Sequence, residues 1–196
     1  IEKARGLAED LVILDLEDAV KPEDKDAARE AAFEAVNLGF PGKLTAIRIN
    51  SSEAPWHEDD VAAVSASASD LFVVPKVEDA NAAAAISARI GKPLLAMIET
   101  PLGVLRAPEI GAANGVAGLI AGTNDLANTL HLPDAGNRDG MSLSLQLIVL
   151  AARASHIWAL DGVFNDLADP DALAAHCLHG RSLGFDGKTL IHPNQI

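Results

Sequence analysis

Short apolar segments, often rich in β-branched residues, recur along the chain and are separated by longer stretches of mixed polarity. Each apolar segment is continuous and bounded by polar residues, a pattern typical of parallel strands that are covered on both faces. The pattern predicts strands over residues 11–16, 45–50, 71–76, 94–99, 118–121, 159–163 and 186–190.

Alanine-rich segments with helical spacing lie between most of these strands. The first has Pro22, Glu23 and Asp24 in its opening turn and stops before Gly39, as expected for a helix. We therefore predict helices over residues 22–38, 58–66, 77–90, 106–113, 142–155 and 171–183. Regular alternation of strands and helices indicates right-handed β/α units, in either an open doubly wound sheet or a closed barrel.

Polar residues at the ends of the predicted strands favour the barrel. An open sheet gathers its ligand groups mainly at one switch point, whereas every strand of a barrel points at the same mouth. Here all of the predicted strands carry such residues at or just after their ends: Glu17, Asp18, Arg48, Asn50, Lys76, Glu99, Asn124, Asp125, Asp161 and Lys188. We predict a single domain, residues 1–196, with a TIM (β/α)8-type barrel whose first strand and C-terminal lid segment are absent from this chain.

Composition limits the classes of partner. The chain has 196 residues, is 49% hydrophobic and carries a net charge of −13, so it has enough apolar residues for a core and an average field that repels nucleic acid and anionic membranes. Neither a long apolar run nor the apolar centre of a signal peptide occurs, and Cys177 is the single cysteine. We expect a cytoplasmic protein that binds neither nucleic acid nor membranes.

The most informative segment is LVILDLEDAV, residues 11–20, in which an apolar strand ends in Asp15, Glu17 and Asp18. Parallel strands carry their chemistry at their C-terminal ends. These acids are therefore predicted to lie at an active site.

Glu99 and Asp125 close successive predicted strands, in MIETP and AGTNDL, so their carboxylates are able to converge on one hard cation. Mg²⁺ takes oxygen ligands and usually keeps waters or substrate oxygens beside one or two carboxylates. The alternative is structural: Asp125 caps a helix starting at Leu126, and Glu99 pairs with a nearby lysine.

Arg48, in the motif RIN, projects from an apolar strand, where an arginine is costly unless it pairs with an anion. A substrate carboxylate would satisfy it, and so would a salt bridge to Glu17, Asp18 or Glu99. Lys76 in VPKVE has the same two interpretations, with structural pairing favoured.

The motifs LVILDLEDAVKPEDKDAAR, RIN, VPKVE, MIETPLGV, AGTNDLA, ALDGVFND and GFDGKTLIHPNQI, taken in order, resemble the citrate lyase beta subunit family within the HpcH/HpaI aldolase superfamily. They cover nearly all of the chain. The resemblance implies a (β/α)8 barrel that uses Mg²⁺ to cleave or form a carbon-carbon bond in a 3-hydroxyacyl thioester such as citryl-, malyl- or citramalyl-CoA, giving acetyl-CoA and a 2-oxo acid.

The resemblance also implies residue roles. Glu99 and Asp125 match the magnesium ligands, with Glu99 also beside the substrate, and Arg48 matches the substrate-binding arginine. Glu17 and Asp18 match the acidic loop beside the metal, so we count them with Arg48 as catalytic residues.

Further expectations concern the thioester carrier and the assembly. Lys25 and Arg29, one turn apart on the first helix, are candidates for the phosphates of CoA or of an acyl-carrier protein, the alternative being a solvated helix face. The family's lid acts on a neighbouring subunit, so we expect a homo-oligomer, trimer or hexamer. Two other functions stay open: a metal-dependent pyruvate aldolase, and a non-catalytic subunit of a larger lyase complex.

Overall fold

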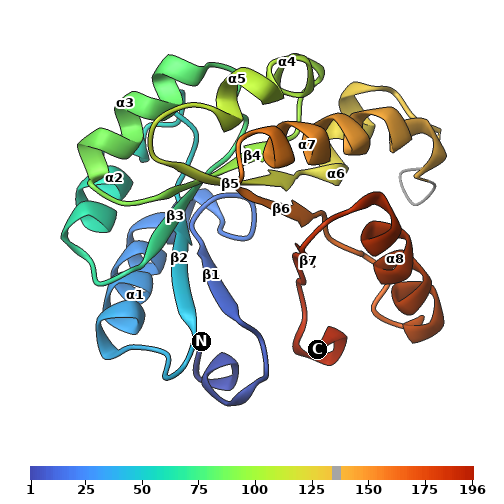
Figure 1. Ribbon diagram of the computed structural model, residues 1–196. Coiled ribbons are helices and arrows are strands. Elements are labelled where there is room, and N and C mark those ends of the chain that lie inside the picture. Colours follow the sequence, from blue (N-terminus) through green and yellow to red (C-terminus); the bar gives the residue numbers. More distant parts are fainter. Residues whose placement is uncertain (134–137) are drawn as a thin grey trace.

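The computed structural model describes residues 1–133 and 138–196, and its centre is a curled parallel sheet (Figure 1). The strands pair in sequence order, and each pairs in parallel with the next. They are β1 (Leu11–Asp15), β2 (Leu44–Arg48), β3 (Leu71–Val74), β4 (Leu94–Ile98), β5 (Val116–Ala121), β6 (Trp158–Asp161) and β7 (Gly187–Lys188). The α/β prediction with a TIM-type barrel is confirmed.

Helices cover the convex face of this sheet (Figure 1). The α-helices are α1 (Lys25–Leu38), α2 (His57–Ala66), α3 (Ala80–Ile90), α4 (Pro101–Leu105), α5 (Ala107–Gly111), α6 (Thr123–Thr129), α7 (Ser142–Ala154) and α8 (Pro170–Leu183). The short 3-10 turns are η1 (Glu2–Gly6), η2 (Pro22–Asp24), η3 (Asp139–Met141) and η4 (Pro193–Gln195).

Two apolar layers hold the fold together, one on each face of the sheet. The layer between sheet and helices is the larger, and contains the fully buried Phe72, Leu94 and Leu119. Ala46, Val73, Leu95 and Ile120 fill the concave face instead, inside the barrel. Because the central strands β3, β4 and β5 are buried on both faces, their sequences read as continuous apolar runs.

The parallel register brings the C-terminal ends of the strands to one edge. Asp15 lies opposite Arg48 at the ends of β1 and β2, and Ile98 lies opposite Ala121 at the ends of β4 and β5. Residues just beyond these positions therefore converge on the mouth of the barrel.

Several predicted boundaries need correction. The helix expected over 22–38 begins with the 3-10 turn η2, and the one expected over 77–90 begins at Ala80. The one expected over 106–113 is the shorter α5, and the short helix α4, which was not predicted, precedes it. Helix α6 was not predicted as a separate element, and β7 is only two residues long.

A closed barrel of this kind has about eight strands. In the described residues the sheet is open between β1 and β7, and a cavity of about 480 Å³ lies between these strands and the residues that flank them. None of the described helices is both long enough and apolar enough to span a membrane.

Candidate functional site

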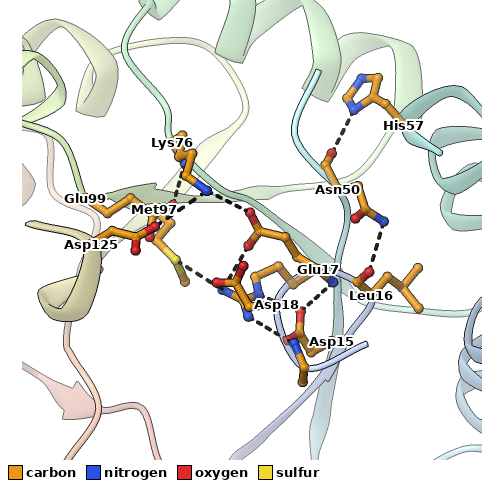
Figure 2. A network of polar contacts seen from close by, with 12 residues as sticks. Asp15, Leu16, Glu17, Asp18, Asn50, His57, Lys76, Met97, Glu99 and Asp125 are labelled. Carbon is orange, nitrogen blue, oxygen red and sulfur yellow. Dashed lines mark hydrogen bonds and ion pairs between the residues drawn. The ribbon is translucent and has the colours of Figure 1, made fainter. Parts of the chain in front are cut away.

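The loop after β1 places its acids around Arg48 at the mouth of the barrel. Figure 2 shows Asp15, Glu17 and Asp18 gathered there. Asp15 receives Nε and Nη2 of Arg48, each at 2.6 Å, and also accepts the backbone N–H groups of Glu17 and Ala19. Burial alone would raise the pKa of Asp15, but Arg48 and these two N–H groups hold it below its usual value. Asp15 therefore stays ionised and anchors both the loop and the arginine.

Arg48 pairs with Glu17 and Asp18, two of the acids that the sequence suggested, and with a third that it did not suggest. Its Nη1 lies 3.1 Å from Glu17 Oε2 and 3.7 Å from Asp18 Oδ2, while Asp15, which was not predicted as a partner, takes the other side of the guanidinium. Burial alone would lower the pKa of Arg48, yet Asp15 and the neighbouring acids raise it. Nη1 also lies 3.7 Å from Met97 Sδ.

Glu99 follows β4, is 4% exposed, and accepts the backbone N–H of Lys76 at 2.8 Å. Burial raises its pKa to about 7; the Lys76 N–H opposes this rise, and the carboxylates of Glu17 and Asp125 add to it. Gly122 leaves the room that this side chain needs, because a Cβ there would lie 2.4 Å from the Cβ of Glu99.

Asp125 lies in the first turn of α6, and its Oδ2 is 3.5 Å from Lys76 Nζ. The same ammonium is 3.3 Å from Glu17 Oε1, so Lys76 bridges acids that follow β1 and β5 (Figure 2). Helix α6 begins at Thr123 and has no side-chain cap, so the capping alternative for Asp125 does not apply. Lys76 itself has a positive φ of 53°, an uncommon backbone conformation for a lysine.

The donor set fits a divalent cation that brings its own waters or substrate oxygens. Within the described residues no group of three or more His, Cys, Asp or Glu side chains forms a complete metal cage. Glu17 Oε2 is buried and accepts no hydrogen bond there, and neighbouring carboxylates raise the pKa of Glu99. A hard cation between Glu99 and Asp125 would relieve this repulsion, and Mg²⁺ needs only one or two carboxylates.

The structure gives Lys25 and Arg29 internal partners. Lys25 Nζ donates to Leu16 O, Glu17 O and Asn50 Oδ1, and Arg29 pairs with Asp60 and Asp26. Lys25 is 6% exposed. All three donors of Lys25 are engaged by the protein, whereas Arg29 Nη2 is buried without a hydrogen-bond partner. The carrier-phosphate role of the two residues stays a prediction.

Asp161 and Lys188 lie apart from these residues, although the sequence pattern grouped them with the site. Asp161 pairs with Arg138 at 2.7 Å, and Lys188 Nζ lies 3.3 Å from the same carboxylate and 2.8 Å from His176 Nδ1. Arg138 directly precedes the turn η3, and His176 lies in α8. They form a separate cluster, here called the α8 cluster: Arg138, Asp161, His176 and Lys188.

A cavity of about 640 Å³ opens beside the site, and Lys76 lines it. Ser51, Ser52 and His57 line one side, and α3 contributes Ala82, Ala83, Ala85, Ile86 and Arg89 to its wall. Small-molecule sites commonly have volumes of about 300–1,000 Å³. The cavity therefore has room for a part of a substrate that extends beyond the carboxylates.

Comparisons with known proteins agree with this geometry. The family model described as HpcH/HpaI aldolase/citrate lyase matches residues 1–193. A protein named (3S)-malyl-CoA thioesterase from Cereibacter sphaeroides is 43% identical over 198 residues, which cover 100% of this chain and 70% of that protein. Citrate lyase subunit beta of Escherichia coli is 31% identical over 201 residues, covering 95% of this chain and 67% of that protein.

Solved structures show the same fold. The citrate lyase beta subunit of Mycobacterium tuberculosis, complexed with oxaloacetate and magnesium, has a TM-score of 0.82 and 32% identity, covering 95% of this chain and 83% of that one. A CitE structure from the same organism, in complex with magnesium, acetoacetate and coenzyme A, has a TM-score of 0.84 and 33% identity, covering 95% and 70%.

Proposed function

Because this chain belongs to the HpcH/HpaI aldolase/citrate lyase family, we propose that it is a Mg²⁺-dependent lyase that cleaves the carbon-carbon bond of a 3-hydroxyacyl-CoA. The substrates considered are citryl-, malyl- and citramalyl-CoA, and the products are acetyl-CoA and a 2-oxo acid. The observation that carries the proposal is the convergence of Glu99, Asp125 and Arg48, which Glu17 and Lys76 link at one mouth. Relatives whose names include magnesium, oxaloacetate and coenzyme A support it.

Glu99 and Asp125 would hold the cation, which supplies Lewis acidity to the oxygens of the oxo-acid half of the substrate. Arg48 donates from Nη1 to the oxygen that becomes the carbonyl, and Asp15 keeps its guanidinium oriented. The burial of Glu99 strengthens each of these contacts, because charges interact more strongly in a medium of low polarity.

Cleavage begins when a base removes the proton of the substrate hydroxyl. The electron pair of that O–H bond forms the new carbonyl, and the adjacent carbon-carbon bond breaks toward the thioester. The resulting enolate takes up a proton to give the acetyl thioester. Glu17 is our candidate for the base that removes the hydroxyl proton. Burial raises the pKa of Glu17 and Asp18 adds to the rise, while Arg48 and Lys76 oppose it.

The remainder of the thioester needs space outside the carboxylate cluster. We place it in the cavity beside Lys76, whose alanine-rich wall suits an uncharged chain with amide groups. Glu53, Glu78 and Asp79 also line this cavity, so the phosphates of a carrier would lie beyond it.

A second reaction is supported by a specific comparison. The 43% identical relative is named a malyl-CoA thioesterase, and that reaction breaks the carbon-sulfur bond instead. Water would then attack the thioester carbonyl, CoA would leave as the thiol, and the 3-hydroxy acid would remain intact. The same carboxylates and Arg48 could bind the malyl group in both reactions.

The deciding experiment incubates the protein with malyl-, citramalyl- and citryl-CoA, with Mg²⁺ or with EDTA, and identifies the products. Acetyl-CoA with a 2-oxo acid establishes the lyase, and free CoA with the intact hydroxy acid establishes the thioesterase. A Glu99→Gln variant should lose either activity, whereas Glu109→Gln, on the exposed side of α5, should retain it.

Two results would overturn both reactions. Cleavage of a free hydroxy-oxo acid to pyruvate and an aldehyde, without CoA, would indicate the pyruvate aldolase. Binding of Mg²⁺ and acyl-CoA without turnover would indicate a non-catalytic subunit of a larger lyase. Trimeric or hexameric assembly stays a prediction, to be measured by light scattering.

A further inference from the structure

Lys25 is a buried lysine directly beneath the acidic loop. Its ammonium donates to Leu16 O, Glu17 O and Asn50 Oδ1, each at 2.7 Å, and it lies 5.2 Å from the ring centroid of Trp56. A lysine ammonium has three N–H donors. All of them are used within the protein, so a ligand would have to displace a buried hydrogen bond to reach this side chain.

Asn50 extends the contact to helix α2. Its Nδ2 donates to Asp60 Oδ2 at 2.6 Å. The same Nδ2 donates to Leu16 O at 2.9 Å, and the backbone carbonyl of Asn50 contacts His57 Nδ1 at 2.9 Å (Figure 2). Asn50 is 3% exposed and Asp60 is fully buried. The loop after β1, the loop after β2 and the start of α2 are therefore joined by one buried polar network.

This network holds the backbone of a residue whose side chain lies in the site. Lys25 fixes the carbonyl of Glu17, and the carboxylate of Glu17 lies 3.1 Å from Arg48 Nη1 and 3.3 Å from Lys76 Nζ. Since Asn50 is two residues after Arg48, the same ammonium also restrains the end of β2. Lys25 thus acts on both partners of the Glu17 and Arg48 pair without touching the mouth.

We propose that Lys25 is a positioning residue, which fixes Glu17 relative to Arg48 by tying the Leu16 and Glu17 carbonyls to Asn50. Its kinetic consequence rests on the proposed thioester cleavage. Misplacement of reacting groups by about 1 Å costs about 100-fold in rate. The position of Glu99 and Asp125 does not depend on this network, since those residues follow β4 and β5.

The kinetic test compares Lys25→Met with Lys21→Met, which removes an exposed lysine from the segment between β1 and α1. We expect Lys25→Met to lower kcat by about 100-fold and to leave the KM for the thioester within about threefold. Mg²⁺ affinity, measured by calorimetry, should also stay within about threefold, and Lys21→Met should match the wild type throughout. A KM raised more than about 10-fold with kcat unchanged would return Lys25 to the phosphate-binding role and overturn the proposal.

Hydrogen exchange tests the same proposal without any turnover. In Lys25→Met the amides of residues 16–20 should exchange about 10-fold faster, while those of residues 117–121 in β5 stay unchanged. Unchanged exchange at 16–20 would overturn the positioning role. Faster exchange there, in a protein that turns over no thioester, would support the positioning role and reject the proposed function instead.

Loss of three buried hydrogen bonds could unfold Lys25→Met at the assay temperature, which circular dichroism would reveal. Lys25→Arg then carries both tests. It keeps the charge, but its planar donors do not match acceptors on three sides. We expect a kcat loss smaller than about 100-fold, again without a rise in KM.

Discussion

Glu99 is a buried carboxylic acid of the site whose pKa is strongly raised. Burial and two neighbouring carboxylates raise its pKa from 4.5 to about 7, so near neutral pH the folded protein holds a carboxyl that an unfolded chain would ionise. A proton and a cation are therefore competitors for the same oxygens. The metal-free protein loses stability when this carboxyl is forced to ionise, because the charge is buried and Glu17 and Asp125 carry like charge.

Glu99→Gln should stabilise the metal-free fold at high pH. Because the pKa of Glu99 is raised in the folded protein, its contribution to the free energy of unfolding is present below pH 4.5. This contribution is lost as pH rises to about 7. The variant should exceed the wild type in unfolding free energy by about 1–3 kcal/mol at pH 8, with the difference shrinking toward pH 4.5. Urea denaturation in EDTA measures this. Equal stabilities at both pH values would contradict the raised pKa, and Glu109→Gln is the matched control.

Site residues were predictable where a charged residue ends an apolar strand segment. They were less predictable where the partner of a charged side chain comes from another strand or loop. Glu99, Asp125 and Arg48 stand out because apolar runs end at them. One partner of Arg48 was missed, since Asp15 reads as the last residue of a strand and only the register between β1 and β2 places it opposite. Lys25 reads as an exposed helix residue, because burial under a loop leaves no periodic signal.

At the scale of elements, β4 and β5 approach closely enough to require a glycine. A Cβ on Gly122 would lie 2.4 Å from the Cβ of Glu99 and 2.6 Å from its Oε2, so the glycine lets β5 continue toward α6 without displacing the carboxylate.

Gly122→Ala should therefore move the carboxylate of Glu99. We expect a loss of about 1–3 kcal/mol in unfolding free energy, together with Mg²⁺ affinity reduced by at least about 10-fold. Thermal unfolding and calorimetry measure the two effects. Gly6→Ala is the control, since nothing lies within 4 Å of a Cβ there. Unchanged affinity in Gly122→Ala would contradict the role of this contact.

Helix α3 supplies the cavity wall, and a bulky residue on that face should block it. We expect Ala82→Trp to raise the KM for the thioester by at least about 10-fold, equal to about 1.4 kcal/mol, without changing Mg²⁺ affinity. Ala88→Trp, also exposed on α3 but outside the cavity lining, should behave as the wild type. Equal effects of the two substitutions would place the carrier elsewhere.

Elements were predictable where one periodicity runs unbroken. All of the strands follow from apolar runs, and the long helices from alanine-rich segments between a proline or acid and a glycine. The segment after Glu99 was misread because Pro101 and Pro108 start separate short helices with Arg106 between them. Contacts with the rest of the barrel, more than local propensity, stabilise such short helices.

At the scale of the whole molecule, polar side chains hold the β7 end of the open sheet. At the β7 end the α8 cluster ties a strand of only two residues to α8. Gly180 permits this contact, because a Cβ there would lie 2.5 Å from Asp161 Oδ2. The single carboxylate of Asp161 serves Arg138, Lys188 and His176, so the charge state of His176 decides how much repulsion this end of the sheet contains.

His176 should make the fold sensitive to acid. Burial, and then the charges of Lys188 and Arg138, lower its pKa from 6.5 to about 4, so the folded protein keeps the imidazole neutral while the unfolded chain protonates it. Stability tied to His176 is therefore lost as pH falls from 6.5 toward 4. Between pH 7 and 4.5 the wild type should lose about 1–2 kcal/mol more than His176→Asn.

Urea denaturation across this pH range checks the expectation, and the difference between the two proteins removes the contribution of carboxylates that titrate in both. His156→Asn is the control, because it removes an exposed histidine that lies outside the α8 cluster. A parallel decline in the wild type and His176→Asn would mean that His176 takes up its proton without unfolding. The α8 cluster would then tolerate a further positive charge, and Asp161 alone would suffice to hold β7 and α8 together.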